Sequence, residues 1–214
     1  MTGDQKWNQH YGRAKSRLSY PDENFVRILS KSISNSASIE KMIAVDIGCG
    51  SGRHLSLLSD FGFRKIIGLD YSMPSLLLSK EHAHSLLINA DSEKLPFGGN
   101  KIDIAVCWGS LHYSDKKSFG IKMSEIFRIL KSGGFLLGTL RSSRDTFMRR
   151  GKEISDNVWI TDLDDIKGSM VSFYDEKELS GAFKQFENFE YGLMERTPLG
   201  SDKVISHWYF VAKK

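Results

Sequence analysis

The sequence is poor in the features that mark specialised classes of protein. Its 214 residues include two cysteines and four prolines. Two cysteines are too few for a disulfide framework, so we interpret Cys49 and Cys107 as reduced thiols of a cytoplasmic protein. No apolar run approaches the ~20 residues of a membrane span, and the first residues lack the apolar core of a signal peptide. No cysteine–histidine pair has the spacing of zinc ligands, so we expect no metal site.

The charge of the chain is also modest. Its formal net charge is +4, with 26% charged and 40% hydrophobic residues, which is ordinary for a globular domain. A chain of this length suits one domain with a full core rather than two. Nucleic-acid-binding proteins usually concentrate lysine and arginine on one face. We therefore expect a small-molecule partner, which could be anionic, rather than nucleic acid.

An apolar strand followed by a glycine turn is the main feature that the sequence does contain. Residues 42–47 predict a buried strand. Gly48, Gly50 and Gly52 follow, and a helical pattern starts at Arg53. A strand, a glycine turn and a helix N-terminus together form a cradle of nucleotide size, with backbone N–H groups facing the ligand. A purely structural turn is the alternative.

The spacing of the glycines and the residue before them narrow the class of ligand. The dinucleotide-binding fingerprint is G-x-G-x-x-G, whereas the third glycine of this chain comes one residue early. Asp46 stands directly before the turn, where a carboxylate would repel a pyrophosphate but suit an ammonium or a sulfonium. The sequence therefore disfavours an NAD-dependent oxidoreductase.

Strands and helices alternate along the rest of the chain. The patterns predict strands at residues 65–70, 85–89, 102–108 and 135–140, and helices at 53–60, 74–81 and 118–131. A further helix is predicted at 175–186, and two strands joined as a hairpin at 189–197 and 203–211. This alternation predicts an α/β fold with a doubly wound, mostly parallel sheet.

Acidic residues follow the second and third predicted strands. The carboxyl ends of strands border the ligand crevice in such sheets. Asp70 ends the second strand and could accept both hydroxyls of a ribose. Asp91 follows the third strand and could accept from the exocyclic amine of adenine, with the backbone N–H of Ser92 facing the ring. Either aspartate could instead serve as a helix N-cap.

Five segments resemble, in order, the motifs of class I methyltransferases that use S-adenosylmethionine (SAM). They are residues 45–52, 68–72, 90–97, 108–113 and 130–135. The resemblance covers roughly residues 40–141 and is closest to the small-molecule, methyltransferase type 11-like subgroup. It implies a Rossmann-like sheet of about seven strands with an antiparallel last strand. It also implies SAM as methyl donor and S-adenosylhomocysteine (SAH) as product.

The resemblance also implies which residues bind the cofactor. The implied contacts are Asp46, Gly48, Cys49 and Gly50 at the methionine part, Asp70 at the ribose, Tyr71, Met73, Asp91 and Ser92 at the adenine, and Trp108 and Gly109 beside the sulfonium. The chain lacks an Asn/Asp-Pro-Pro-Tyr segment, which amino-methylating nucleic-acid enzymes of this fold use. This absence also disfavours DNA and many RNA acceptors.

Candidate catalytic residues lie outside the cofactor motifs. His112 follows the fourth strand, and its partly neutral imidazole could act as a general base; a packed or capping histidine is the alternative. Tyr11 lies with Trp7 in an N-terminal segment that often closes over the site in this family, and it could contact the acceptor or simply pack. Tyr113 is a further substrate-binding candidate. His207, on the last strand, is more typical of a sheet-face residue.

Basic residues gather after the fifth strand, where the pattern becomes irregular. We predict that residues 142–172 form a substrate loop or lid, because irregular segments of this length are usually functional. Arg141 and Arg144 could bind a phosphate or carboxylate of the acceptor, or belong to a solvated basic face.

These features predict one domain over residues 1–214. Its parts are an N-terminal helical cap (1–40), a SAM-binding core (41–141), the loop or lid (142–172) and a C-terminal helix with a strand pair (173–214). We predict methyl transfer to a small polar acceptor, at a hydroxyl, by a monomer or homodimer. Transfer to nitrogen or carbon of another metabolite, RNA or protein stays open, as does a non-catalytic SAM-binding regulator.

Overall fold

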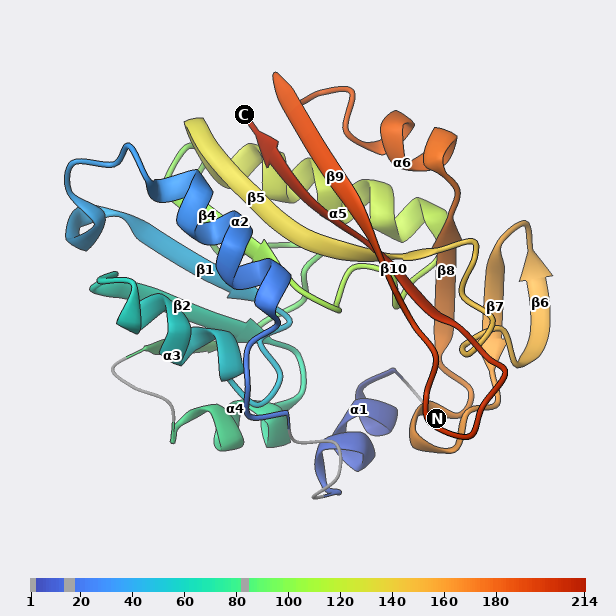
Figure 1. The fold of residues 1–214 in the computed structure, drawn as a ribbon. Coiled ribbons are helices and arrows are strands. Elements are labelled where there is room, and N and C mark those ends of the chain that lie inside the picture. Colours follow the sequence, from blue (N-terminus) through green and yellow to red (C-terminus); the bar gives the residue numbers. More distant parts are fainter. Residues whose placement is uncertain (1–2, 14–17, 82–84) are drawn as a thin grey trace.

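A computed structural model describes residues 3–13, 18–81 and 85–214 of the chain (Figure 1). Its helices are α1 (Gly3–Tyr11), α2 (Glu23–Ile33), α3 (Arg53–Asp60), α4 (Met73–Ser79), α5 (Lys116–Ile129) and α6 (Glu176–Ala182). Its strands are β1 (Ile43–Ile47), β2 (Lys65–Asp70), β3 (Leu86–Asn89), β4 (Ile102–Cys107), β5 (Leu130–Ser142), β6 (Gly151–Ser155), β7 (Val158–Thr161), β8 (Met170–Tyr174), β9 (Asn188–Arg196) and β10 (Ile205–Lys213). None of these helices is long and apolar enough to cross a membrane.

The strands form one ten-stranded sheet rather than the roughly seven strands that the resemblance implied, and seven of them make up its centre. The strand order is β3-β2-β1-β4-β5, continued by β10 and β9. The first five strands are parallel, while β10 runs antiparallel to both β5 and β9. Parallel neighbours need crossover connections, which the intervening helices provide. The predicted Rossmann-like α/β class and its antiparallel last strand are therefore confirmed.

Helices cover both faces of this sheet. Leu29 of α2, Leu55 of α3 and Leu76 of α4 pack on one face, against Ala44 and other strand residues. The aromatic and aliphatic side chains of α5 and α6 pack on the other face, and Figure 1 shows α5 behind β5 when α2 and α3 lie in front. The helix at residues 23–33 is thus a core element, and of the predicted N-terminal cap only α1 lies over the sheet edge.

Residues 142–174 do not form the irregular loop that the sequence predicted. They fold into the antiparallel meander β6-β7-β8, and β8 joins the central sheet through Arg141 and Ser142 of β5. The hairpin between β6 and β7 turns at Asn157, which has a positive φ of 55°, a conformation that asparagine tolerates. Short strands with weak alternation hid this structure from the sequence.

The meander has a hydrophobic core of its own. Met148, Ile166, Val171 and Phe173 are buried together in it, and Trp7 of α1 packs against this cluster with other large side chains. The hydroxyl of Ser172 donates a hydrogen bond to the carbonyl oxygen of Ser114. The backbone N–H of Ser172 donates to the carbonyl oxygen of His112 at 2.8 Å. The meander therefore supports the loop after β4 as a buttress, and its predicted role as a lid stays a prediction.

We predict that this buttress unfolds together with the central sheet. Phe173 is fully buried, so Phe173→Ala should lower the free energy of unfolding by about 3–5 kcal/mol through the lost contacts and the cavity. Urea unfolding measures this change. Ile154→Ala on the exposed face of β6 is the matched control and should change stability by less than about 0.5 kcal/mol. A small effect of Phe173→Ala would mean that residues 142–174 open independently.

Candidate functional site

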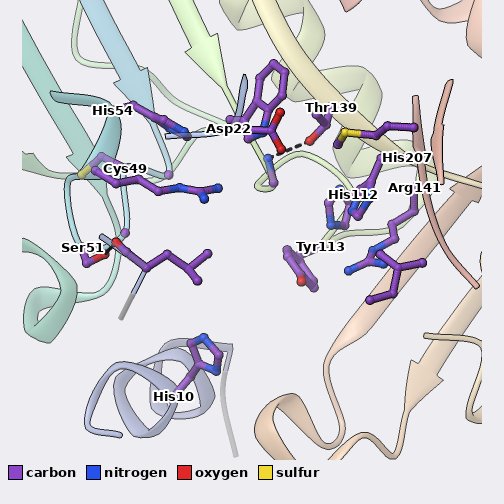
Figure 2. A pocket seen from close by; sticks show the side chains of 18 of the residues that line it. His10, Asp22, Cys49, Ser51, His54, His112, Tyr113, Thr139, Arg141 and His207 are labelled. Carbon is purple, nitrogen blue, oxygen red and sulfur yellow. Dashed lines mark hydrogen bonds between the residues drawn. The ribbon is translucent and has the colours of Figure 1, made fainter. Parts of the chain in front are cut away.

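Two connected cavities lie at the carboxyl edge of the parallel strands. The larger measures about 410 Å³ and the smaller about 90 Å³. Trp7, Tyr11, Gly48, Gly109 and Tyr113 line both, so the two cavities meet beside the glycine turn. Figure 2 looks into the larger cavity, with Cys49, Ser51 and His54 on one wall and His112, His207 and Arg141 on the opposite one.

The three glycines of the turn all need a backbone that other residues rarely adopt. Their φ angles are 76° at Gly48, 56° at Gly50 and 88° at Gly52. A Cβ atom on Gly48 would lie 2.4 Å from the Cβ of Ser110. The N–H groups of Gly48 and Cys49 donate to the carbonyl of Leu69. The turn therefore offers bare Cα surface to a ligand, and the expected cradle of free N–H groups is wrong at these two positions.

Asp46 is buried beneath the turn. Its Oδ2 atom has no hydrogen-bond partner among the described residues and lies 3.7 Å from Nδ1 of His54. A buried carboxylate oxygen without a partner is costly and rare. Asp46 is outside the lining of both cavities, so its predicted contact with an ammonium group stays a prediction.

Asp70 fixes the turn to the end of β2. Its two carboxylate oxygens accept from the backbone N–H groups of Gly50 at 2.9 Å and Ser72 at 2.8 Å. Burial raises the pKa of Asp70, and these two hydrogen bonds oppose the shift. The side chain lines the smaller cavity, where a carboxylate with remaining lone pairs can accept from a ribose diol.

The expected adenine contacts are only partly brought together. Tyr71 and Ser92 line the smaller cavity, whereas Met73 and Asp91 are outside its lining. Met73 is half exposed on α4, and Asp91 accepts from the N–H of Glu93 at 2.9 Å. Asp91 thus makes the local turn contact that was the alternative to adenine recognition, and its predicted role stays a prediction.

Lys122 of α5 also lines the smaller cavity, and no pattern in the sequence pointed to it. It is 9% exposed, and burial lowers its pKa. Only the pairing of α5 with the sheet brings this lysine to the ligand edge. At the junction of the cavities, Gly109 donates its N–H to Oγ1 of Thr139 at 2.9 Å, and Trp108 lines the larger cavity nearby.

The acceptor wall of the larger cavity consists of His112, His207 and Arg141. The centroids of the two imidazoles are 5.8 Å apart. Burial lowers the pKa of His112 well below its ordinary value, and Arg141 and His207 lower it further. Burial and then Arg141 lower the pKa of His207 in the same way. Both rings are therefore neutral near pH 7.

His207 is the functional candidate that the sequence undervalued. It stands opposite Arg141 in the antiparallel pairing of β10 with β5. An antiparallel strand begins where its parallel neighbour ends, so the first residues of β10 reach the carboxyl edge. The antiparallel last strand that the sequence predicted already implied that its first residues, including His207, reach this edge.

The arginines after β5 separate into individual pairs instead of forming one basic face. Arg141 is buried and bonds through Nη1 to Oδ2 of Asp145. Arg144 is exposed, pairs with Glu195 at 2.9 Å and is outside the lining of either cavity. Of the two arginines predicted to bind the acceptor, only Arg141 lies on the cavity wall.

Helix α1 covers the site. The Ser72 hydroxyl bonds to Oδ1 of Asn8 at 2.8 Å, and Trp7 packs edge-to-face on Tyr113 with the ring centroids 4.7 Å apart. The Tyr11 hydroxyl lies over Gly50. Burial raises the pKa of Tyr11 well above its ordinary value, as does the nearby Asp70. Tyr11 therefore stays protonated and can act as a hydrogen-bonding group but not as a base.

Comparisons with known proteins agree with this geometry. Residues 45–138 match the family profile described as "Methyltransferase domain". The 1,6-didemethyltoxoflavin N1-methyltransferase of Burkholderia thailandensis, crystallised with 1,6-didemethyltoxoflavin and SAH, has the same fold: the TM-score is 0.68 at 15% identity, over 100% of this chain and 91% of that one. Residues 45–138 thus carry a methyltransferase domain similar to that of the class I SAM-dependent methyltransferases.

The names of two sequence relatives do not indicate a common methyl acceptor. An uncharacterised protein of Methanocaldococcus jannaschii is 26% identical, over 83% of this chain and 73% of the relative. The tRNA N(3)-methylcytidine methyltransferase of Drosophila melanogaster is 24% identical over 84% of this chain, which spans only 59% of that protein. Among the described residues of the methyltransferase, no three histidine, cysteine or acidic side chains gather to hold a metal ion.

We predict that the two buried neutral imidazoles make this methyltransferase less stable in acid. Their folded-state pKa values lie below the unfolded value of about 6.5, so the unfolded chain binds more protons below that pH. The free energy of unfolding should therefore rise with pH up to about 6.5 and then level off, by at most about 1.4 kcal/mol per pH unit for each histidine.

Guanidinium unfolding at pH values of about 5.5 and 7.5 tests this prediction. In His207→Gln, the difference in stability between the two pH values should shrink. An unchanged difference would show that folding does not lower the pKa of His207.

Proposed function

We propose that this chain transfers a methyl group from SAM to a hydroxyl of a small polar molecule. SAM supplies a methyl group that its sulfonium already activates, so the protein must mainly align the acceptor and exclude water. The observation that supports this proposal best is the arrangement of two adjoining cavities. The smaller one has the features of a SAM site, and the larger one carries a polar wall formed by His112, His207 and Arg141.

The cofactor half of the cavity fits SAM in charge and shape. Asp46, buried directly beneath the glycine turn and outside the lining of both cavities, places negative charge near the ammonium. Gly48 and Gly50 leave space where side chains would clash. Asp70 accepts from the ribose hydroxyls, and Tyr71 and Ser92 line the adenine end. Cys49 lies at the methionine end as a protonated thiol, since burial raises its pKa well above the ordinary value.

In the acceptor half, His112 binds the nucleophile. Neither of its buried ring nitrogens has a hydrogen-bond partner among the described residues. The neutral ring can accept the proton that a hydroxyl loses on methylation. The low pKa limits how long the ring keeps this proton, so His112 orients the hydroxyl and passes the proton on to solvent. Trp7 and Tyr113 shield this reaction from water.

A tRNA base is the second candidate acceptor, because the Drosophila relative acts on tRNA by name. The arginines after β5 argue for the small molecule. Arg144 and Arg150 pair with Glu195 and Asp162, and Arg149 donates to Asn157. The two acidic partners offset the charges of Arg144 and Arg150, whereas Arg149 keeps its charge, so this part of the surface offers phosphates one unpaired arginine rather than three.

Titration calorimetry with SAM and SAH tests the cofactor site. Asp70→Asn should weaken SAH binding by about tenfold to a hundredfold, because hydrogen bonds to a charged group contribute about 1.5–3 kcal/mol. Asp60→Asn is the matched control: this exposed aspartate ends α3, away from both cavities, and its loss should leave the affinity unchanged. Absence of SAH binding by the unaltered protein would refute the proposal.

SAH release from SAM, measured with a panel of small alcohols, amines and tRNA, tests the acceptor. We expect turnover with a hydroxyl compound, and a kcat lower by about 10²–10⁴-fold in His112→Asn, because a general base contributes by this factor. The SAH dissociation constant of the variant should stay unchanged. Turnover with tRNA alone would favour the second candidate, and SAH binding without any turnover would favour a SAM-binding regulator.

A further inference from the structure

The two imidazoles of the acceptor wall come from segments far apart in the sequence. His112 lies in the loop after β4, and His207 lies near the start of β10. Figure 2 shows both rings side by side on one wall of the cavity, with Arg141 and Tyr113 next to them. The ring centroids are 5.8 Å apart, close enough for one small group to contact both.

The hydrogen-bonding capacity of this pair is open to a ligand. Both ring nitrogens of His112 are buried, and the described residues make no hydrogen bond of normal geometry to them, although the backbone of Thr139 lies near enough to raise the pKa of the ring slightly. Buried polar atoms almost always have a partner, so an unpartnered imidazole on a cavity wall indicates a site for a bound group. The half-buried ring of His207 lines the same cavity.

The charges around the two rings keep them neutral. Arg141 lies beside both and already pairs with Asp145, and it lowers the pKa of each histidine in addition to burial. Arg196 acts on His207 in the same direction. A neutral imidazole carries one N–H donor and one acceptor nitrogen. Two neutral imidazoles therefore complement a group that can both donate and accept.

We propose that His112 and His207 together form a two-imidazole site that selects an uncharged hydroxyl and rejects an ammonium. One ring accepts the hydroxyl proton in a hydrogen bond while the N–H of the other donates to the hydroxyl oxygen. An ammonium can only donate, so the N–H of the second ring would face it without an acceptor. Arg141 and Arg196 would also repel its charge. This assignment deepens the proposed function and rests on it.

The test uses SAH-loaded protein and two probes of matched size. Benzyl alcohol carries an uncharged hydroxyl, and benzylammonium carries a cation on the same ring, which can pack beside Trp7 and Tyr113. Long-range proton–nitrogen NMR spectra of the histidine rings follow each titration near neutral pH. We expect benzyl alcohol to shift the ring resonances of both His112 and His207, and benzylammonium to leave them in place.

Variants of His207 separate recognition from folding. His207→Leu should weaken benzyl alcohol binding about fivefold, the loss of one hydrogen bond of about 1 kcal/mol. His207→Gln keeps a donor and should retain most of the affinity. Tyr191→Phe on the neighbouring strand β9 is the control, because this hydroxyl bonds to Glu176 outside the cavity and should not affect either probe.

The outcomes separate the two proposals. Loss of SAH binding in the unaltered protein would refute the proposed function itself. Intact SAH binding would overturn the two-imidazole site if benzylammonium binds as tightly as benzyl alcohol, if neither probe shifts the two rings, or if His207→Leu leaves the affinity for benzyl alcohol unchanged.

Discussion

The polar wall of the larger cavity depends on one buried carboxylate, that of Asp145. Its Oδ2 atom accepts from Arg141 Nη1 and from the N–H of Ser206 at 2.9 Å, and its Oδ1 atom accepts from the N–H of Met148 at 2.7 Å. The carboxylate thus joins the end of β5, the start of β10 and the segment that leads into the meander. Removing one partner of a buried ion pair costs about 3–5 kcal/mol because the other charge stays uncompensated. Asp145 consequently holds both Arg141 and the neighbour of His207 in place.

The two halves of the cavity are built from different kinds of structure. Most of the cofactor half comes from one part of the chain, from the glycine turn after β1 to the loop after β4, where the geometry follows from local turns and strand ends. Trp7 and Tyr11 of α1 and Lys122 of α5 complete its lining. The acceptor half combines α1, the end of β5 and the β9–β10 hairpin. Segments far apart in sequence meet there only after the sheet has formed.

This difference explains what the sequence could predict. The strand–helix alternation, the glycine turn and the positions of Asp46 and Asp70 are local features, and the structure confirms the fold that they indicate. The meander was missed because its strands are short and are stabilised by the cluster around Phe173 rather than by their own pattern. Lys122 and His207 were missed or undervalued because strand pairing and helix packing bring them to the edge. Arg144 was a reasonable candidate by sequence, but it lies outside the lining of both cavities and pairs with Glu195 of β9.

The pairing of β10 with β5 has a consequence for how the acceptor wall can vary. Side chains alternate between the two faces of a strand, so a shift of one residue exchanges the faces. Trp208 resists such a shift, because its buried indole N–H donates to the carbonyl of Tyr174 at 2.8 Å. The connection at residues 197–204 lies outside both strands and can change in length without altering the register. A single residue inserted between Ser206 and Trp208 would instead move the side chains before Trp208 to the opposite face of β10. A different side chain would then replace the imidazole of His207 on the cavity wall, while the cofactor half would stay unchanged.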